Sequence, residues 1–311
     1  MIQIFNYNAG KGDCIRLRYI GKSGEAKNIM VDSGVLRADF GYRFKQICNS
    51  LVESKEQIDI FILTHIDNDH IGGLLWNLRR NERLPIKEVW MNHGRLIKNN
   101  VDLSLKQNDE VYTRLYKQGI LIKSAKQGSM RELDGAIFRI IGPSEENLEK
   151  MFLQNRKISC DLSRKKTDYN YALEELMEMP INGTDNRIEN RISIVFELEL
   201  EGKKFLFTGD AWGKDIITTL KSKKYDMVKL PHHGSIYNIS EEWSDLQCNN
   251  FMICTDGKSH PDKQTIAKLL KWKDRINIYA SNNWWENHFL IEEDKKYLDR
   301  LHFIIGEKSL W

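Results

Sequence analysis

The sequence predicts an α/β protein, because short apolar strands alternate with helical segments through both halves of its 311 residues. The strand-like segments often end abruptly in Asp, His or Gly, where open α/β sheets carry functional groups. In chain order, strands are expected at 2–5, 14–20, 28–32, 58–64, 89–91, 121–122, 137–141, 192–200, 204–207, 227–230 and 277–280, and helices at 40–54, 74–80 and 265–272.

One stretch, from about 144 to 188, interrupts this pattern. It contains helical segments at 145–152 and 171–179, joined by the polar residues 163–167. We interpret it as a helical insertion that forms a peripheral flap near the functional site. The chain is therefore expected to be one domain over 1–311.

The composition restricts the protein's class. Hydrophobic residues make up 41% of the chain, enough for a sizeable core, and no apolar run approaches the 18 residues of a membrane span. Lys and Arg total 47 against 44 Asp and Glu, so charge alone indicates neither nucleic-acid nor membrane binding. Five scattered cysteines without a CxxC pair, and a start without signal-peptide features, predict reduced thiols and a cytoplasmic location.

The densest chemical signal is the segment His65-Ile-Asp67-Asn-Asp69-His70. Four possible metal ligands lie within six residues, directly after an apolar strand and before two glycines. So many ligands from one short loop suit two cations better than one tetrahedral site. The alternative is a solvated polar loop in which Asp69 caps the following helix.

Three further strands run into polar groups. They end at Asp32-Ser33-Gly34, at Gly209-Asp210 and at His232-His233-Gly234-Ser235. Each alone is a weak signal. Together they offer a bridging carboxylate and additional imidazoles, which a two-metal site requires.

With these motifs in order, the chain resembles the metallo-β-lactamase-fold hydrolases, in the branch related to the hydrolase domain of the competence protein ComEC. The resemblance covers residues 2 to about 275. Its motifs are Asn8-Ala-Gly-Lys-Gly-Asp13, Val31-Asp32-Ser33-Gly34, Thr64 to Gly73, Asn190-Arg-Ile-Ser193-Ile-Val, Thr208-Gly209-Asp210-Ala211, Pro231-His-His-Gly-Ser235 and Gly257-Lys-Ser-His260-Pro261.

The resemblance implies an αββα sandwich with a dinuclear site at one edge of its two sheets. One metal would take His65 and Asp67, and the other Asp69 and His70, with Asp210 as the bridge. Either His232 or His233 would complete the second site. We favour His233 as the ligand and His232 as a phosphate contact or proton donor, and the reverse assignment stays open. The groups implied in catalysis are Asp69, Asp210, His232 and His260, with Asp13, Asp32, Asn190, Ser193 and Ser235 supporting the ligands or contacting substrate.

Two departures from the wider superfamily bear on the metal. Asp67 stands where most members have His, and a glycine-flanked His that usually precedes the bridging Asp is replaced by the region of Asn190 and Ser193. The first metal site is therefore rich in oxygen ligands, which shifts the preference from Zn²⁺ toward Mn²⁺. Two divalent ions, Zn or Mn, are the expected cofactors.

The function predicted from this resemblance is hydrolysis of a phosphodiester, with DNA or RNA as the expected substrate. A small-molecule phosphodiesterase is the alternative within the same chemistry. A non-catalytic module that senses a ligand or holds a partner on the same fold is the alternative from another class. No membrane partner is expected, and the sequence singles out no protein partner.

Overall fold

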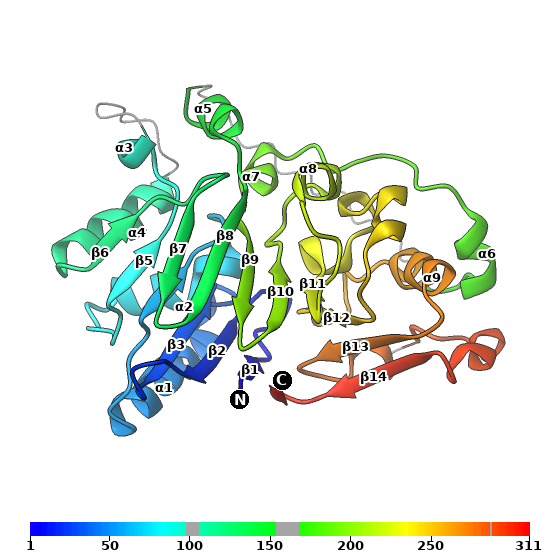
Figure 1. The fold of residues 1–311 in the computed structure, drawn as a ribbon, viewed down its shortest axis with the longest axis horizontal. Helices are drawn as coiled ribbons and strands as arrows, with labels where there is room; N and C mark the ends of the chain where they lie inside the picture. The colour runs from blue at the N-terminus through cyan, green and yellow to red at the C-terminus, as the bar shows by residue number, and fades with distance from the viewer. Residues whose placement is uncertain (98–105, 154–167, 287) are drawn as a thin grey trace.

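Two β-sheets form the centre of the computed structural model, which describes residues 1–97, 106–153, 168–286 and 288–311. The first sheet has the strand order β15-β1-β2-β3-β4-β5-β6 and the second the order β14-β13-β12-β11-β10-β9-β8-β7 (Figure 1). The first comprises β1 (Gln3–Asn6), β2 (Ile15–Ile20), β3 (Ala26–Val31), β4 (Ile60–Ile62), β5 (Glu88–Trp90), β6 (Leu121–Lys123) and β15 (Lys308–Leu310). The second comprises β7 (Met130–Leu133), β8 (Ala136–Gly142), β9 (Val195–Leu200), β10 (Lys203–Phe207), β11 (Met227–Lys229), β12 (Asn250–Met252), β13 (Ile276–Ala280) and β14 (Leu301–Ile305).

Helices cover the outer faces of both sheets. The described helices are α1 (Ala38–Glu53), α2 (Asn68–Arg79), α3 (Gly94–Ile97), α4 (Lys106–Lys117), α5 (Glu145–Leu153), α6 (Leu173–Glu178), α7 (Ile188–Arg191), α8 (Gly213–Thr219) and α9 (Lys263–Trp272). Helices α1, α2 and α4 pack on the first sheet, and α6, α8 and α9 on the second. The predicted four-layer αββα sandwich is therefore confirmed.

The spacing of apolar residues along each element determines which of its faces is buried. In β2, Ile15, Leu17 and Tyr19 face the space between the sheets, where they meet Phe138 and Phe196 of the second sheet. In α1, buried residues recur at helical spacing, which directs one face of that helix onto the first sheet. Strand β4 is buried at every position, as expected for a strand covered on both faces.

Parallel pairing brings the functional motifs to one edge. Strands β3, β4, β5 and β6 are parallel to one another, and so are β10, β11, β12, β13 and β14. Asp32 follows β3 and His65 follows β4, whereas Asp210 follows β10 and His232 follows β11. The carboxyl ends of strands from both sheets thus carry the predicted site.

The structure corrects three expectations. Helix α2 begins at Asn68, so Asp69 and His70 lie in its first turn rather than in a loop. Strands β14 and β15 at the end of the chain were not predicted. The described part of the 144–188 segment contains the helices α5 and α6, as expected. Helix α6 is no flap, because its Leu173 and Leu176 are buried against α9 in the core. Residues 154–167, which include the predicted polar joint at 163–167 and Cys160, lie outside the described residues.

The remaining cysteines, Cys14, Cys48, Cys248 and Cys254, are buried free thiols. None of the helices in the described part of the chain has the length and apolar character that crossing a bilayer requires.

Candidate metal centre

The carboxylate of Asp210 lies at the centre of the site. Its Oδ2 is 3.3 Å from Nε2 of His70 and 3.5 Å from Nε2 of His233. The Nε2 atoms of His65 and His232 each lie 3.8 Å away. Four imidazoles from two segments of the chain therefore converge on one carboxylate oxygen.

Hydrogen bonds of Asp32 fix the orientation of two of these imidazoles. Its Oδ2 lies 2.8 Å from Nδ1 of His70, and it also accepts a hydrogen bond of 2.6 Å from the Thr64 hydroxyl. Because that hydroxyl gives its proton to Asp32, it can only accept from Nδ1 of His65, which lies 3.0 Å away. Both histidines then carry a proton on Nδ1 and point Nε2 at Asp210.

A backbone carbonyl fixes the orientation of the His233 imidazole. Its Nδ1 lies 2.9 Å from the carbonyl oxygen of Cys254, which can only accept, so this nitrogen must carry a proton. His232 and His233 both have a positive φ, at 47° and 54°, inside the turn Pro231–Gly234. Such left-handed backbone is costly for non-glycine residues and is concentrated at functional sites.

The residues present fit a bound metal. The Nε2 atoms of His65, His70 and His233 are buried without a hydrogen-bond partner among the described residues, and so is Oδ1 of Asp210. Buried polar atoms in native proteins are nearly always satisfied, so several orphans facing one another point to a ligand. Imidazole nitrogens around a shared carboxylate are a donor set that suits Zn²⁺ or Mn²⁺.

Burial and neighbouring charges shift the pKa values of the histidines in the site. Burial lowers the pKa of His65 to about 3, so this ring is neutral. Burial also disfavours the charged form of His70, but Asp210 and Asp32 outweigh it and raise the pKa of His70 well above its usual value. A metal at Nε2 of His70 must therefore displace a proton, which makes binding depend on pH.

The two other aspartates of the histidine-rich motif each face a basic residue. Asp69 Oδ2 is 3.1 Å from Nζ of Lys11 and 3.9 Å from Nε2 of His233. Asp67 Oδ2 accepts a 2.8 Å hydrogen bond from Nη2 of Arg187. Burial raises the pKa of Asp67, and the charge of Arg187 opposes this effect.

Lys229 is a charged residue of the site that sequence reasoning missed. It is buried at the end of β11, where its Nζ pairs with Asp13, lies 3.7 Å from Oδ1 of Asp210 and donates to the carbonyl of Gly209 at 2.9 Å. Burial would lower the pKa of Lys229, but Asp13 and Asp210 raise it, so the lysine is a fixed positive charge. A lone lysine in an apolar strand was the signal that could have identified it.

Asp13 contacts both Lys229 and two of the histidines, on the side of the rings that faces away from Asp210. Its Oδ1 is 3.2 Å from Nδ1 of His233, and its Oδ2 is 3.9 Å from Nδ1 of His70. These contacts are to the nitrogens that face away from Asp210. Asp13 is therefore placed to support the imidazoles, and its carboxylate is also a further candidate ligand, because it offers an oxygen within 4.8 Å of possible ligand atoms of His70, Asp210 and His233.

Asp185 is a second residue of the site that the sequence did not single out. It accepts hydrogen bonds from the side-chain amides of Asn190 (2.6 Å) and Asn238 (2.9 Å), and its Oδ2 lies 3.4 Å from Nδ1 of His232. Burial would lower the pKa of His232. The carboxylates of Asp210 and Asp185 outweigh burial and raise this pKa to about 9. The side chain of His232 is 23% exposed, whereas that of His233 is 5% exposed.

The remaining predicted residues lie around this cluster. The Ser193 hydroxyl accepts a 3.2 Å hydrogen bond from the backbone N–H of Asp210. The ring of His260 lies 5.0 Å from that of His232. Ser235 instead accepts a hydrogen bond from the backbone N–H of Tyr237, so its hydroxyl caps the following turn.

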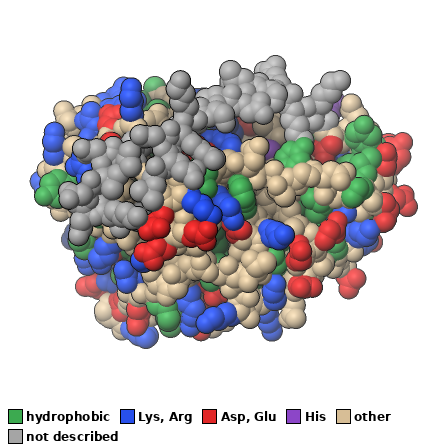
Figure 2. All heavy atoms as spheres, turned by 90° about the horizontal axis from the view of Figure 1, so that it is seen from above, with side chains coloured by type: hydrophobic (Ala, Val, Ile, Leu, Met, Phe, Trp, Pro, Cys, Tyr) green, Lys and Arg blue, Asp and Glu red, His purple; other side chains and the backbone are tan. Residues whose placement is uncertain are grey.

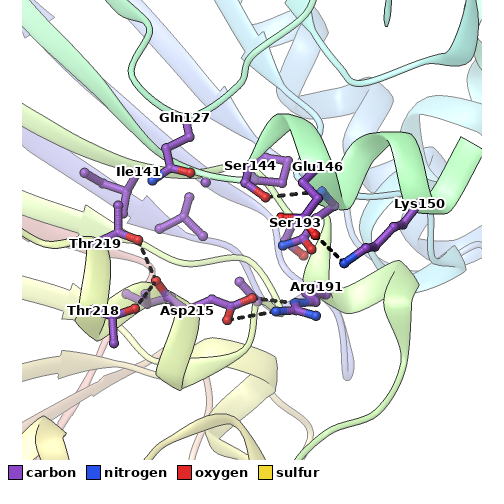
Figure 3. Close-up of a pocket in the computed structure, with 16 residues that line it drawn as sticks. Gln127, Ile141, Ser144, Glu146, Lys150, Arg191, Ser193, Asp215, Thr218 and Thr219 are labelled. Atoms are coloured by element: carbon purple, nitrogen blue, oxygen red, sulfur yellow. Dashed lines mark hydrogen bonds and ion pairs between the residues drawn. The ribbon is translucent and has the colours of Figure 1, made fainter.

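A cavity of about 200 Å³ adjoins the site on the side of Ser193 (Figure 3). Its charged side chains are paired with one another: Arg191 with Asp215 and Lys150 with Glu146. The cavity is thus polar without a net charge of its own.

No family model matches the chain. Among characterised proteins, it is 22% identical over 288 residues to ComE operon protein 3 of Bacillus subtilis (strain 168), a match that covers 86% of this chain and 30% of that protein. The chain therefore spans less than a third of the length of this relative. The match fits the ComEC-related branch that the motifs indicate.

Solved structures of similar architecture share about 10% sequence identity with the chain. The metallo-β-lactamase fold protein YhfI from Bacillus subtilis matches with a TM-score of 0.47, over 100% of this chain and 99% of that one. Zn²⁺-bound PqqB from Methylobacterium extorquens matches with a TM-score of 0.45, over 90% and 98%. CmlA, a diiron β-hydroxylase from Streptomyces venezuelae, matches with a TM-score of 0.47, over 99% and 53%.

Proposed function

We propose that the chain is a metal-dependent hydrolase that cleaves phosphodiesters, with nucleic acid as its substrate. The observation that carries the proposal is the convergence of three buried, partnerless Nε2 atoms on the carboxylate of Asp210. In this proposal His65, His70 and His233 would hold two divalent ions together with Asp67 and Asp69, with the carboxylate of Asp210 between them. His233 rather than His232 is assigned as the ligand, since it is the more deeply buried and its Nδ1 is fixed by a backbone carbonyl.

Bound divalent cations would supply a hydroxide at neutral pH and neutralise charge that develops on the phosphate. The chain's own residues do the positioning. Asp32 keeps Nε2 of His70 aimed at Asp210, and the ammonium of Lys229 lies 3.7 Å from the other oxygen of the same carboxylate. His232, partly exposed and held by Asn238 through a 3.0 Å contact at Nδ1, is placed to contact the phosphate or to give a proton to the leaving oxygen.

A small phosphodiester is the second candidate substrate. On the face nearest α5, α7 and α8, Lys and Arg side chains are interspersed with Asp and Glu, so no broad positive surface is visible among the described residues (Figure 2). Two neighbouring basic residues are engaged in other contacts: Arg79 pairs with Glu110, and Arg80 stacks on Trp76. A polymer-binding enzyme would benefit from a basic surface, which a small diester does not require.

The test begins with metal content, followed by turnover. Protein purified with excess metal should contain about two divalent ions per chain, and it should hydrolyse bis(p-nitrophenyl) phosphate, single-stranded DNA or RNA with Mn²⁺, Zn²⁺ or Mg²⁺. Nitrocefin should not be hydrolysed. Cleavage of the small diester alone would select the second candidate, and metal-free protein after this purification would support a non-catalytic module.

A further inference from the structure

Two basic side chains stand at the solvent side of the candidate metal centre. Lys11, in the glycine-rich loop before β2, pairs with Asp69 at 3.1 Å, and Arg187, just before α7, pairs with Asp67 at 2.8 Å. Their side chains are 61% and 37% exposed, whereas those of the imidazoles His65 and His70 are fully buried. Two segments far apart in the sequence thus place one basic side chain each at the two aspartates of the histidine-rich motif.

Arg187 has hydrogen-bonding capacity that its ion pair does not use. Its Nε is buried and has no hydrogen-bond partner in the part of the chain that the structure describes, and the carboxylate of Glu189 comes only within 4.0 Å of it. A guanidinium offers five donors in a planar fork, a geometry that matches the oxygens of a phosphate. The ammonium of Lys11 offers three donors from a flexible stem.

We propose that Lys11 and Arg187 bind the phosphate of the substrate, and that each is released for this role when a divalent cation binds its aspartate. The inference rests on the proposed function, because it names residues that recognise the diester. A cation on the carboxylate of Asp69 repels the ammonium of Lys11, and the same holds for Arg187 at Asp67. A phosphate anion at the centre then provides the negative charge that the two side chains have lost.

The alternative is that both ion pairs only position Asp67 and Asp69. The two possibilities predict opposite effects on metal binding. If the basic residues position the ligands, removing them lowers metal affinity. If they compete with the metal for the carboxylates, removing them leaves metal affinity unchanged or raises it.

The experiment uses the variants Lys11→Met and Arg187→Met of the full chain. Lys203→Met and Arg37→Met are matched controls, because each of these side chains reaches solvent and pairs with an aspartate outside the site, Asp226 and Asp39. Mn²⁺ is titrated into metal-free protein by calorimetry, and inorganic phosphate is then titrated into the Mn²⁺-loaded protein. Both readouts are independent of turnover.

We expect Mn²⁺ affinity to be unchanged or up to about tenfold higher in Lys11→Met and Arg187→Met, while phosphate affinity falls by about tenfold or more, the effect of one charge-assisted hydrogen bond. The controls should behave like the unmodified chain. Lys11→Arg should retain most of the phosphate affinity, whereas Arg187→Lys should retain only part of it, because an ammonium keeps the charge but lacks the planar fork. Lower Mn²⁺ affinity with unchanged phosphate binding overturns the proposal, as does loaded protein that binds no phosphate or a chain that binds no Mn²⁺.

Turnover separates this inference from the proposed function and identifies the source of the phosphate. Hydrolysis that persists with unchanged phosphate binding in the variants rejects the inference alone. Metal and phosphate binding as expected, without hydrolysis of any diester, rejects the proposed function. If the phosphate belongs to a polynucleotide, the variants raise KM for a single-stranded oligonucleotide more than for bis(p-nitrophenyl) phosphate, and the difference shrinks at high salt.

Discussion

Oδ2 of Asp32 lies 2.8 Å from Nδ1 of His70, and both side chains are fully buried. The same carboxylate also accepts from the hydroxyl and the backbone N–H of Thr64, the residue before His65. One residue at the end of β3 thus determines which nitrogen of two histidines faces Asp210. Its φ of 55° places it in the left-handed region, so the backbone itself is turned to aim this carboxylate.

Asp32→Asn should therefore weaken metal binding, although Asp32 is not itself a proposed metal ligand. An amide has only one acceptor oxygen, so it cannot accept from His70 and from both groups of Thr64. We expect metal affinity to fall by about 10- to 100-fold, the usual effect of losing an outer partner of a ligand. Calorimetric titration with Mn²⁺ and with Zn²⁺ measures this change.

Asp59→Asn is the matched control for this prediction, because Asp59 is a buried aspartate that accepts from the backbone N–H of Asn28, outside the site. It should bind metal like the unmodified chain. Equal metal affinity in Asp32→Asn and Asp59→Asn would show that Asp32 does not orient the ligands.

The proposed ligands themselves lead to a second prediction. Asp69→Asn and Asp210→Asn should each reduce hydrolysis by at least about 100-fold, beyond the effect of an outer partner, because an amide does not bridge or neutralise metal ions as a carboxylate does. The fold should be retained, since both residues lie beyond the ends of the strands. Turnover of the substrate panel, with circular dichroism as the check on folding, tests this.

Asp215→Asn serves as the control for these two variants. Asp215 lies in α8, five residues after Asp210, and pairs with Arg191 at the adjoining cavity. It should keep its activity. Turnover in Asp210→Asn that equals turnover in Asp215→Asn would contradict the assignment of the bridge.

The sequence predicted the part of the site that is encoded locally. His65, His70, Asp210 and His233 follow strands in recognisable motifs, and parallel pairing brings strand ends together in both sheets. What could not be predicted depends on contacts between distant segments. Asp185 and Arg187 lie in a stretch without periodicity, and only tertiary packing brings them to His232 and Asp67.

The same distinction applies to the fold. Helix α1 has five buried apolar residues at helical spacing, so its pattern identified it. Helix α6 is six residues long and was interpreted as peripheral because polar residues precede it, yet its packing on α9 makes it part of the core. The edge strand β15 is half exposed, so it has little apolar pattern of its own, and its pairing partner β1 lies about three hundred residues earlier.

Glycine at position 72 provides a prediction about stability. A Cβ added there would lie 2.0 Å from the backbone nitrogen of Leu36 and 2.1 Å from the carbonyl carbon of Val35. Alanine in a helix interior normally gains about 1 kcal/mol over glycine. A clash with backbone atoms outweighs this gain, so we expect Gly72→Ala to destabilise the protein by about 1–3 kcal/mol.

Urea unfolding of Gly72→Ala measures the loss, and Gly142→Ala is its control. A Cβ at Gly142 would meet only the side chain of Val195, at an ordinary distance of 3.7 Å. This variant should differ little from the unmodified chain. Equal stability of the two variants would mean that α2 does not pack as closely on the 33–36 loop as the structure shows.

The buried imidazole of His93 makes stability depend on pH. Its Nδ1 accepts a hydrogen bond from the backbone N–H of Arg95 at 3.1 Å, so its Nε2 carries the proton that is donated to Asp109 at 2.9 Å. Burial lowers the pKa of His93, and Asp109 only partly opposes this. The unfolded chain therefore binds the second imidazole proton, which would go to Nδ1, more tightly than the folded chain does. The stability that the neutral ring contributes is lost as pH falls below about 6.5, the unfolded value.

His93→Gln should flatten this dependence, because glutamine can accept and donate the same hydrogen bonds but does not titrate. Asp109→Asn should make it steeper, since it removes the charge that favours the imidazolium while keeping an acceptor for Nε2. Urea unfolding at pH 7.5 and 5.5 with a chelator present gives the loss of stability for each chain. The histidines of the metal centre titrate in all three proteins, so their contribution cancels in the comparison. If His93→Gln loses as much stability between these two pH values as the unmodified chain does, the imidazole is not held neutral by burial.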